Sequence, residues 1–181
     1  MQELSHLLAE ATAAIERDYF LLSIHGGLPV YRERVYCYEL YHQMRKRWPG
    51  GCPFWLNGEV DKAAHPKLME LGADGFKPDL LVHRPGDMGG NHAVLEVKPA
   101  RSARQGAPKD LNTLSVFRRV VGYERAIYLI YGGDISGKLV EHIEHHAERS
   151  DMPLPVELWV HTAPGQAAVH VKTLQSSAAA R

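Results

Sequence analysis

Apolar residues in the first half of the chain follow two spacings, one typical of helices and one typical of strands. Leucine and alanine at intervals of three and four predict an amphipathic helix over residues 2–18. A second apolar stripe at the same spacing predicts a helix over residues 31–48. Short, partly alternating apolar runs predict strands over 54–60, 78–83 and 92–98, and the glycine-rich connection between the last two indicates a hairpin.

The second half of the chain continues this alternation of elements. The pattern predicts helices over 109–120 and 135–148, a buried strand over 126–131, and two final strands over 156–161 and 167–171. Strands interleaved with helices favour an α/β fold with a central mixed β-sheet flanked by helices. An N-terminal helix precedes this core, and a C-terminal helix plus hairpin follows it.

Length and composition fit one ordinary globular domain. The 181 residues predict a single domain over 1–174, followed by a short polar tail over 175–181 that we expect to be disordered. The chain's two cysteines form neither a metal-binding spacing nor a disulfide framework, which favours an intracellular, cytoplasmic protein. No run approaches the ~20 apolar residues that span a bilayer, so no membrane partner is expected. A formal net charge of zero argues against coating nucleic acid by charge alone, but it allows a local grip on a few phosphates.

Candidate chemistry begins with Glu96 and Lys98 on the third predicted strand. Side chains alternate between the two faces of a strand, so these two residues point to the same face. A salt bridge on a solvated strand face would explain this pair equally well, because the triplet on its own is common. Asp79 favours a functional site over a simple salt bridge, since the hairpin brings the start of the preceding strand opposite Glu96.

Two carboxylates held side by side repel each other unless a cation lies between them. Mg²⁺ and Mn²⁺ suit such a place, because hard divalent cations bind one or two carboxylates plus water. A metal there would polarise a phosphoryl oxygen and lower the pKa of bound water. Lys98 would then orient that water or stabilise charge on the phosphate.

The segments Gly75-Phe76-Lys77-Pro78-Asp79 and Leu95-Glu96-Val97-Lys98 resemble the motif of the PD-(D/E)XK nuclease superfamily. The resemblance covers roughly the central hundred residues. It implies a restriction-endonuclease-like core of one helix, three strands, a helix and a fourth strand. It also implies that Asp79 and Glu96 are metal ligands and that Lys98 is the catalytic lysine.

Two glutamates are candidates for a third metal-binding carboxylate. Many members of the superfamily carry a glutamate on the helix before the first strand, and Glu39 lies on that predicted helix. Glu59 lies at the end of the first predicted strand, close to the expected site. A solvated surface charge is the alternative interpretation of each residue, and the sequence leaves the choice open.

Three further residues are candidates for contacts with substrate. Lys109 and Arg101 belong to a basic cluster, and His83 flanks the hairpin turn, although solvated charges and turn contacts explain them equally well. The function expected from these patterns is a divalent-metal-dependent nuclease that hydrolyses phosphodiester bonds in DNA or RNA. The alternative is a catalytically inactive binding or scaffolding module that keeps the nuclease fold. A homodimer is a possible assembly, because homodimers are the commonest oligomers.

Overall fold

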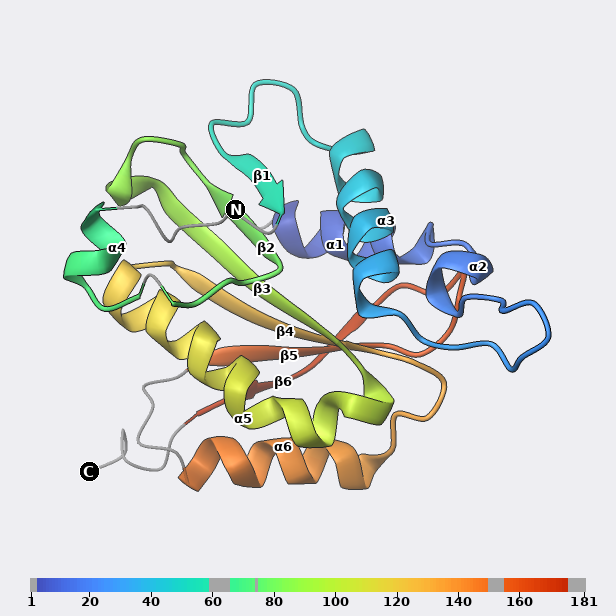
Figure 1. Ribbon diagram of the computed structural model, residues 1–181. Coiled ribbons are helices and arrows are strands. Elements are labelled where there is room, and N and C mark those ends of the chain that lie inside the picture. The colour runs from blue at the N-terminus through green and yellow to red at the C-terminus, as the bar shows by residue number, and fades with distance from the viewer. Residues whose placement is uncertain (1–2, 59–65, 74, 150–154, 176–181) are drawn as a thin grey trace.

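The computed structural model describes residues 3–58, 66–73, 75–149 and 155–175, and its centre is a six-stranded sheet (Figure 1). The strands are β1 (Trp55–Gly58), β2 (Leu80–His83), β3 (Asn91–Pro99), β4 (Arg125–Tyr131), β5 (Val156–His161) and β6 (Val169–Leu174). They lie side by side in chain order. The pairs β3/β4 and β4/β5 are parallel, and the other three pairs are antiparallel. The expected mixed sheet is therefore confirmed.

Helices cover both faces of this sheet (Figure 1). They are α1 (Glu3–Ala13), α2 (Arg17–Phe20), α3 (Glu33–Lys46), α4 (Pro66–Glu70), α5 (Ala100–Val116) and α6 (Gly137–Arg149), with a 3₁₀ turn η1 (Met88–Gly90) and a π-helical turn η2 (Phe117–Val121). One hydrophobic core lies between the sheet and helices α1 and α3, and a second lies between the sheet and helices α5 and α6. Among the described residues, no helix has both the length and the apolar character needed to cross a membrane.

The alternation of side chains along β3 decides which layer each residue faces. Leu95 and Val97 pack into the core beneath α1 and α3, whereas Val94 packs into the core beneath α5. Glu96 and Lys98 alternate with Leu95 and Val97, so they face the α5 layer together, as expected from the strand period. A carboxyl group and an ammonium group are thereby placed between the sheet and a helix.

The helix that follows β3 begins earlier than the sequence pattern predicts. We expected it over residues 109–120, but α5 starts at Ala100, directly after the last residue of β3. Its interior contains Pro108, which is unfavourable in a helix because it lacks an N–H group. Burial of Ala100, Ala103 and Ala107 against the sheet outweighs that cost. The early start matters for the site, because it places Asp110 in the middle of the helix.

Two smaller differences concern the ends of the chain. The first helix ends at Ala13, and the separate short helix α2 follows it, where one helix over 2–18 was expected. The last strand covers Val169–Leu174 and is shifted towards the C-terminus by two to three residues from the expected 167–171. Of the expected tail, residues 176–181 lie outside the part of the chain that the structure describes.

Candidate metal and phosphodiester site

The register of β2 against β3 brings two carboxyl groups together. Leu80 pairs with Leu95 in the antiparallel ladder, so the preceding residue, Asp79, lies opposite Glu96. Asp79 Oδ2 accepts a hydrogen bond of 2.7 Å from the backbone N–H of Val97. A side-chain hydrogen bond also joins the carboxyl groups of Asp79 and Glu96. The hairpin therefore brings Asp79 and Glu96 together, as the sequence pattern predicts.

Lys98 extends this pair along the same face of β3. Its Nζ lies 2.9 Å from Glu33 Oε2 and 3.5 Å from Asp110 Oδ2. Glu33 belongs to the first turn of α3, and Asp110 belongs to the middle of α5. The ammonium group is thus held between two helices that lie on opposite faces of the sheet.

Helix α5 reaches Lys98 because no loop separates it from β3. The helix turns back over the sheet, and Gly106 comes to lie against the aliphatic part of the lysine side chain. A Cβ at this position would lie 3.3 Å from both Cδ and Cε of Lys98. One turn further along, Asp110 also accepts a hydrogen bond of 3.0 Å from the Tyr128 hydroxyl on β4. These contacts fix the position of the Asp110 carboxyl group on the inner side of the helix.

These groups surround a polar cavity of about 300 Å³, which we call the carboxylate cavity. Its lining consists of Glu33, Gly75, Phe76, Lys77, Asp79, Glu96, Lys98, Lys109, Asp110 and Thr113. Four of these side chains are carboxylic and three are lysines, and the most deeply buried lysine, Lys98, is already paired with two of the carboxylates. The inner part of the cavity is therefore rich in oxygen ligands.

Burial and mutual repulsion make the carboxyl groups hard to ionise without a cation. Burial, followed by the charge of Asp79, raises the pKa of Glu96 well above its usual range. Burial also raises the pKa of Asp79 to about 6, although the Val97 N–H opposes this shift. Burial by itself lowers the pKa of Lys98, but its hydrogen bond to Glu33 and the nearby carboxylates outweigh that effect and raise it. The lysine is therefore charged at neutral pH.

The chemistry of these ligands fits a hard divalent cation. A Mg²⁺ ion bound by one or two carboxylates normally keeps several water ligands, and Asp79 and Glu96 supply two carboxylates beside a polar cavity. A cation there would favour the ionised form of both acids and remove their repulsion. Within the described ranges, no group of three or more histidine, cysteine, aspartate or glutamate side chains is arranged to hold a metal. The fit therefore rests on the Asp79–Glu96 pair.

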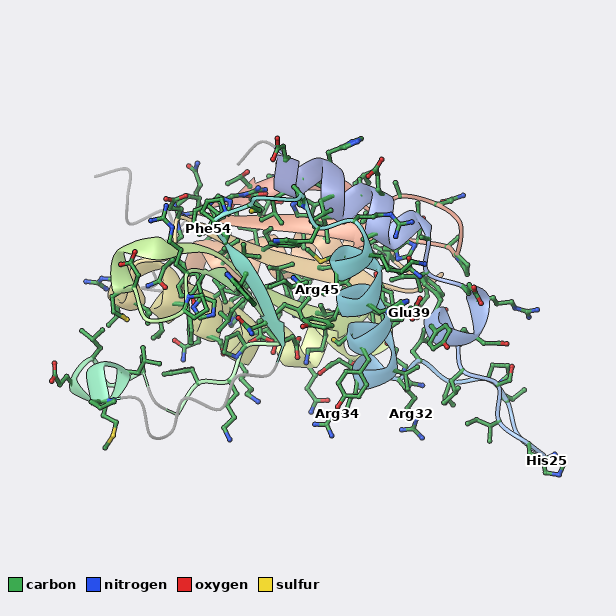
Figure 2. All side chains as sticks on the ribbon, turned by 90° about the horizontal axis from the view of Figure 1, so that it is seen from above. His25, Arg32, Arg34, Glu39, Arg45 and Phe54 are labelled. Atoms are coloured by element: carbon green, nitrogen blue, oxygen red, sulfur yellow. The ribbon has the colours of Figure 1, made fainter. Side chains whose placement is uncertain are left out.

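Neither of the two candidate glutamates is placed in the carboxylate cavity by the described residues. Glu39 is buried on α3 and accepts a hydrogen bond of 2.6 Å from Gln43 Nε2. Figure 2 shows Glu39 on the flank of α3 turned away from β1, and it does not line the carboxylate cavity. The carboxylate that α3 contributes is Glu33, six residues earlier. Glu59 lies outside the described residues.

The fold places the three candidate substrate contacts in different parts of the molecule. Lys109 lines the carboxylate cavity. The guanidinium of Arg101 packs over the ring of Tyr31 and donates a hydrogen bond of 2.6 Å to its backbone carbonyl. His83 lies on β2, and its Nε2 is 3.0 Å from Asn57 Oδ1. Of these three residues, only Lys109 lines the cavity.

Sequence reasoning missed Glu33 and Asp110 as neighbours of Lys98. For Asp110 the missing signal was the start of α5, because a helix beginning at residue 109 places this residue in its first turn, away from β3. For Glu33, no local pattern in the sequence indicates which turn of α3 reaches the end of β3. Both residues therefore depend on long-range packing.

Comparisons with known proteins do not assign the chain to a family. No family model matches the chain, and searches of curated proteins and of solved structures give no significant match.

Proposed function

We propose that the chain is a divalent-metal-dependent nuclease of the PD-(D/E)XK type, with Mg²⁺ or Mn²⁺ as its cofactor. The observation that carries the proposal is the antiparallel register that opposes Asp79 and Glu96, with Lys98 on the same face and directed into the same cavity. The substrate class is nucleic acid, because the site combines two metal-binding carboxylates with lysines that suit a phosphate.

The order of elements around the site supports the same proposal. Helix α3, strands β1, β2 and β3, helix α5 and strand β4 occur in the chain order that the resemblance implies, with the short helix α4 inserted between β1 and β2 and the turns η1 and η2 inserted before β3 and β4. The two acids and Lys98 lie on β3 and at the start of β2, which are the central parts of such a core. This agreement concerns arrangement only, so the proposal still depends on the chemistry of the site.

In the reaction, a water oxygen forms a bond to phosphorus and the bond from phosphorus to the leaving oxygen breaks. The proton of the attacking water passes to bulk solvent, and the leaving oxygen takes a proton from bulk solvent. Asp79 and Glu96 would hold the divalent cation, which would supply Lewis-acid polarisation of the phosphate and a lowered pKa for the attacking water. Lys98 donates a hydrogen bond to that water or to a phosphate oxygen. Glu33 and Asp110 hold the ammonium group in place, and Lys109 at the cavity contacts the flanking phosphate.

A cleavage assay on labelled DNA and RNA tests the proposal. We expect cleavage that needs Mg²⁺ or Mn²⁺, stops in EDTA, and falls at least about 100-fold in Asp79→Asn, Glu96→Gln and Lys98→Met. Glu39→Gln is the matched control, because it changes a buried carboxylate outside the cavity. Thermal denaturation checks that each variant folds. Cleavage that survives both Asp79→Asn and Lys98→Met in folded protein would rule out this site.

One observation favours a second candidate, a module that binds nucleic acid without turnover. The described residues hold only a two-carboxylate metal site, and Lys98 is already paired with Glu33 and Asp110. Calorimetric titration with Mg²⁺ and Mn²⁺ distinguishes the two functions. Metal binding that depends on Asp79 and Glu96 supports the nuclease, and the absence of binding supports the module.

A further inference from the structure

A second pocket adjoins the carboxylate cavity and shares Asp79 with it. This pocket has a volume of about 390 Å³ and is lined by Cys37, Tyr38, Tyr41, Asn57, Gly58, Asp79 and Leu80. It lies between α3 and β1, the strand at the edge of the sheet. A Cβ on Gly58 would lie 3.7 Å from the Asp79 carbonyl and 3.8 Å from the ring of Tyr41, so the tyrosine lies close to the proposed metal ligand.

The outer surface of α3 beside this pocket carries two tyrosines flanked by two arginines. Arg34, Tyr38, Tyr41 and Arg45 follow one another at intervals of four, three and four residues, which places them on one face of the helix. From Arg34 to Arg45 this face measures about 16 Å. Figure 2 shows these two arginines on α3 alongside β1. At the stacked spacing of 3.4 Å, this length corresponds to roughly five nucleotides.

A smaller pocket includes Arg45 from this face of α3. It has a volume of about 180 Å³ and is lined by Arg45, Trp48, Cys52, Phe54 and Trp55. Trp55 and Tyr38 expose 58% and 60% of their surface, which is unusual for large aromatic residues. We call the set Arg34, Tyr38, Tyr41, Arg45, Trp55 and Asn57 the α3–β1 surface.

We propose that the α3–β1 surface binds the unpaired bases of a single-stranded nucleic acid and leads its backbone to Asp79; this inference rests on the proposed nuclease function. Exposed aromatic rings next to arginines form the kind of platform on which unpaired bases stack. In a duplex the base faces are already covered by neighbouring bases, so the rings would have nothing to stack against. The amide of Asn57 is held by the ring of His83 and offers a hydrogen bond to a base edge.

Binding without turnover tests this inference separately from the nuclease activity. Fluorescence anisotropy in EDTA compares a labelled single strand, as DNA and as RNA, with the matching duplex. We expect the wild-type protein to bind at least one of the single strands at least about tenfold more tightly than the duplex. Tyr38→Ala with Trp55→Ala should weaken single-strand binding by roughly tenfold or more, whereas Tyr38→Phe should retain it because the ring is kept.

The control is Tyr19→Ala, which removes another exposed aromatic residue, on α2, and should leave binding unchanged. Arg34→Gln with Arg45→Gln should lower affinity and reduce the dependence of binding on salt, since fewer counterions are released.

Equal or tighter binding of the duplex overturns the inference, even where the duplex is cleaved in a metal-dependent way. Concentration-dependent dimerisation that Tyr38→Ala and Trp55→Ala abolish, without oligonucleotide binding, assigns the surface to a second copy and also overturns it. Single-strand binding that follows the expected pattern without any cleavage supports this surface and contradicts the nuclease.

Discussion

At the scale of single residues, the site depends on how Lys98 is held. Glu33 and Asp110 lie on different helices, and both contact the same ammonium group. A lysine has a long side chain with many rotamers, so two fixed acceptors lower the entropy cost of placing its charge. In the proposed nuclease, we therefore expect Glu33 to position Lys98.

We predict that Glu33→Gln lowers cleavage by roughly tenfold, because the closest partner of Lys98 loses its charge. The double variant Glu33→Gln/Lys98→Met should cleave no more slowly than Lys98→Met alone, since Glu33 has nothing left to position. Rates for the wild type, both single variants and the double variant provide the measurement. Additive losses in the double variant would show that Glu33 acts independently of Lys98.

A second prediction concerns a histidine on the opposite face of the sheet. His161 is fully buried, its Nδ1 lies 2.7 Å from the Tyr36 hydroxyl, and burial lowers its pKa from 6.5 to about 4. Between these pH values the unfolded chain binds a proton that the folded chain does not. The free energy of unfolding should therefore fall as pH drops, by about 1.4 kcal/mol per pH unit from this residue.

Urea denaturation between about pH 6.5 and about pH 4 measures this effect. His161→Gln should lower the slope of the free energy of unfolding against pH relative to the wild type, whatever its effect on absolute stability, because the contribution that rises with pH is lost. His25→Gln is the control, because His25 is exposed on the loop before α3 (Figure 2). Identical slopes for His161→Gln and the wild type would contradict the assigned pKa.

At the scale of elements, α5 carries a glycine where its packing against β3 requires one. Glycine in a helix interior costs about 1 kcal/mol relative to alanine. At Gly106, a Cβ would lie 3.0 Å from Asp110 Oδ2 and 3.3 Å from Lys98 Cδ, so the larger residue would shift the Asp110 carboxyl group and the lysine side chain by a few tenths of an ångström. The glycine thus gives up helix stability to leave room for Lys98.

We predict that Gly106→Ala changes stability by no more than about 1 kcal/mol but lowers cleavage by roughly ten- to a hundredfold. Thermal denaturation and cleavage rates measured on the same preparation separate the two effects. Gly137→Ala in α6 is the matched control, since an added Cβ there would have no atom within 4 Å. Full activity in Gly106→Ala would show that the space beside Lys98 is not needed.

The elements also show what the sequence could predict. Apolar spacing indicated the strands and the same-face placement of Glu96 and Lys98, because both follow from local geometry. The predicted start of α5 at residue 109 was wrong, because burial of small side chains against the sheet outweighs the local preferences around Pro108. The partners of Lys98 depend on which turns of α3 and α5 reach β3, and that is set by tertiary packing.

At the scale of the whole molecule, a bound cation would stabilise the sheet near its centre. Asp79 lies next to β2 and Glu96 lies on β3, so an ion between them links two strands that face both cores. Without a cation, the raised pKa of Asp79 means that the folded chain keeps a proton that the unfolded chain has released. The contribution of Asp79 to the stability of the metal-free chain should therefore fall as pH rises from 3.8 through about 6.

We predict that Mg²⁺ raises the melting temperature more at about pH 8 than at about pH 5.5, because the metal replaces protons at the site. Thermal scans with Mg²⁺ and with EDTA at both pH values measure the difference. Asp79→Asn keeps an acceptor for the Val97 N–H and should lose the Mg²⁺ effect. A melting temperature unaffected by Mg²⁺ at both pH values would contradict a metal site here.

The most direct test of a metal site between Asp79 and Glu96 is a crystal structure of the protein soaked in Mn²⁺, read from its anomalous difference density. We expect one peak between the carboxyl groups of Asp79 and Glu96, with Lys98 on the same side and no peak in Asp79→Asn crystals. Density that shows the two acids still hydrogen-bonded to each other, with no manganese peak between them, would contradict this expectation.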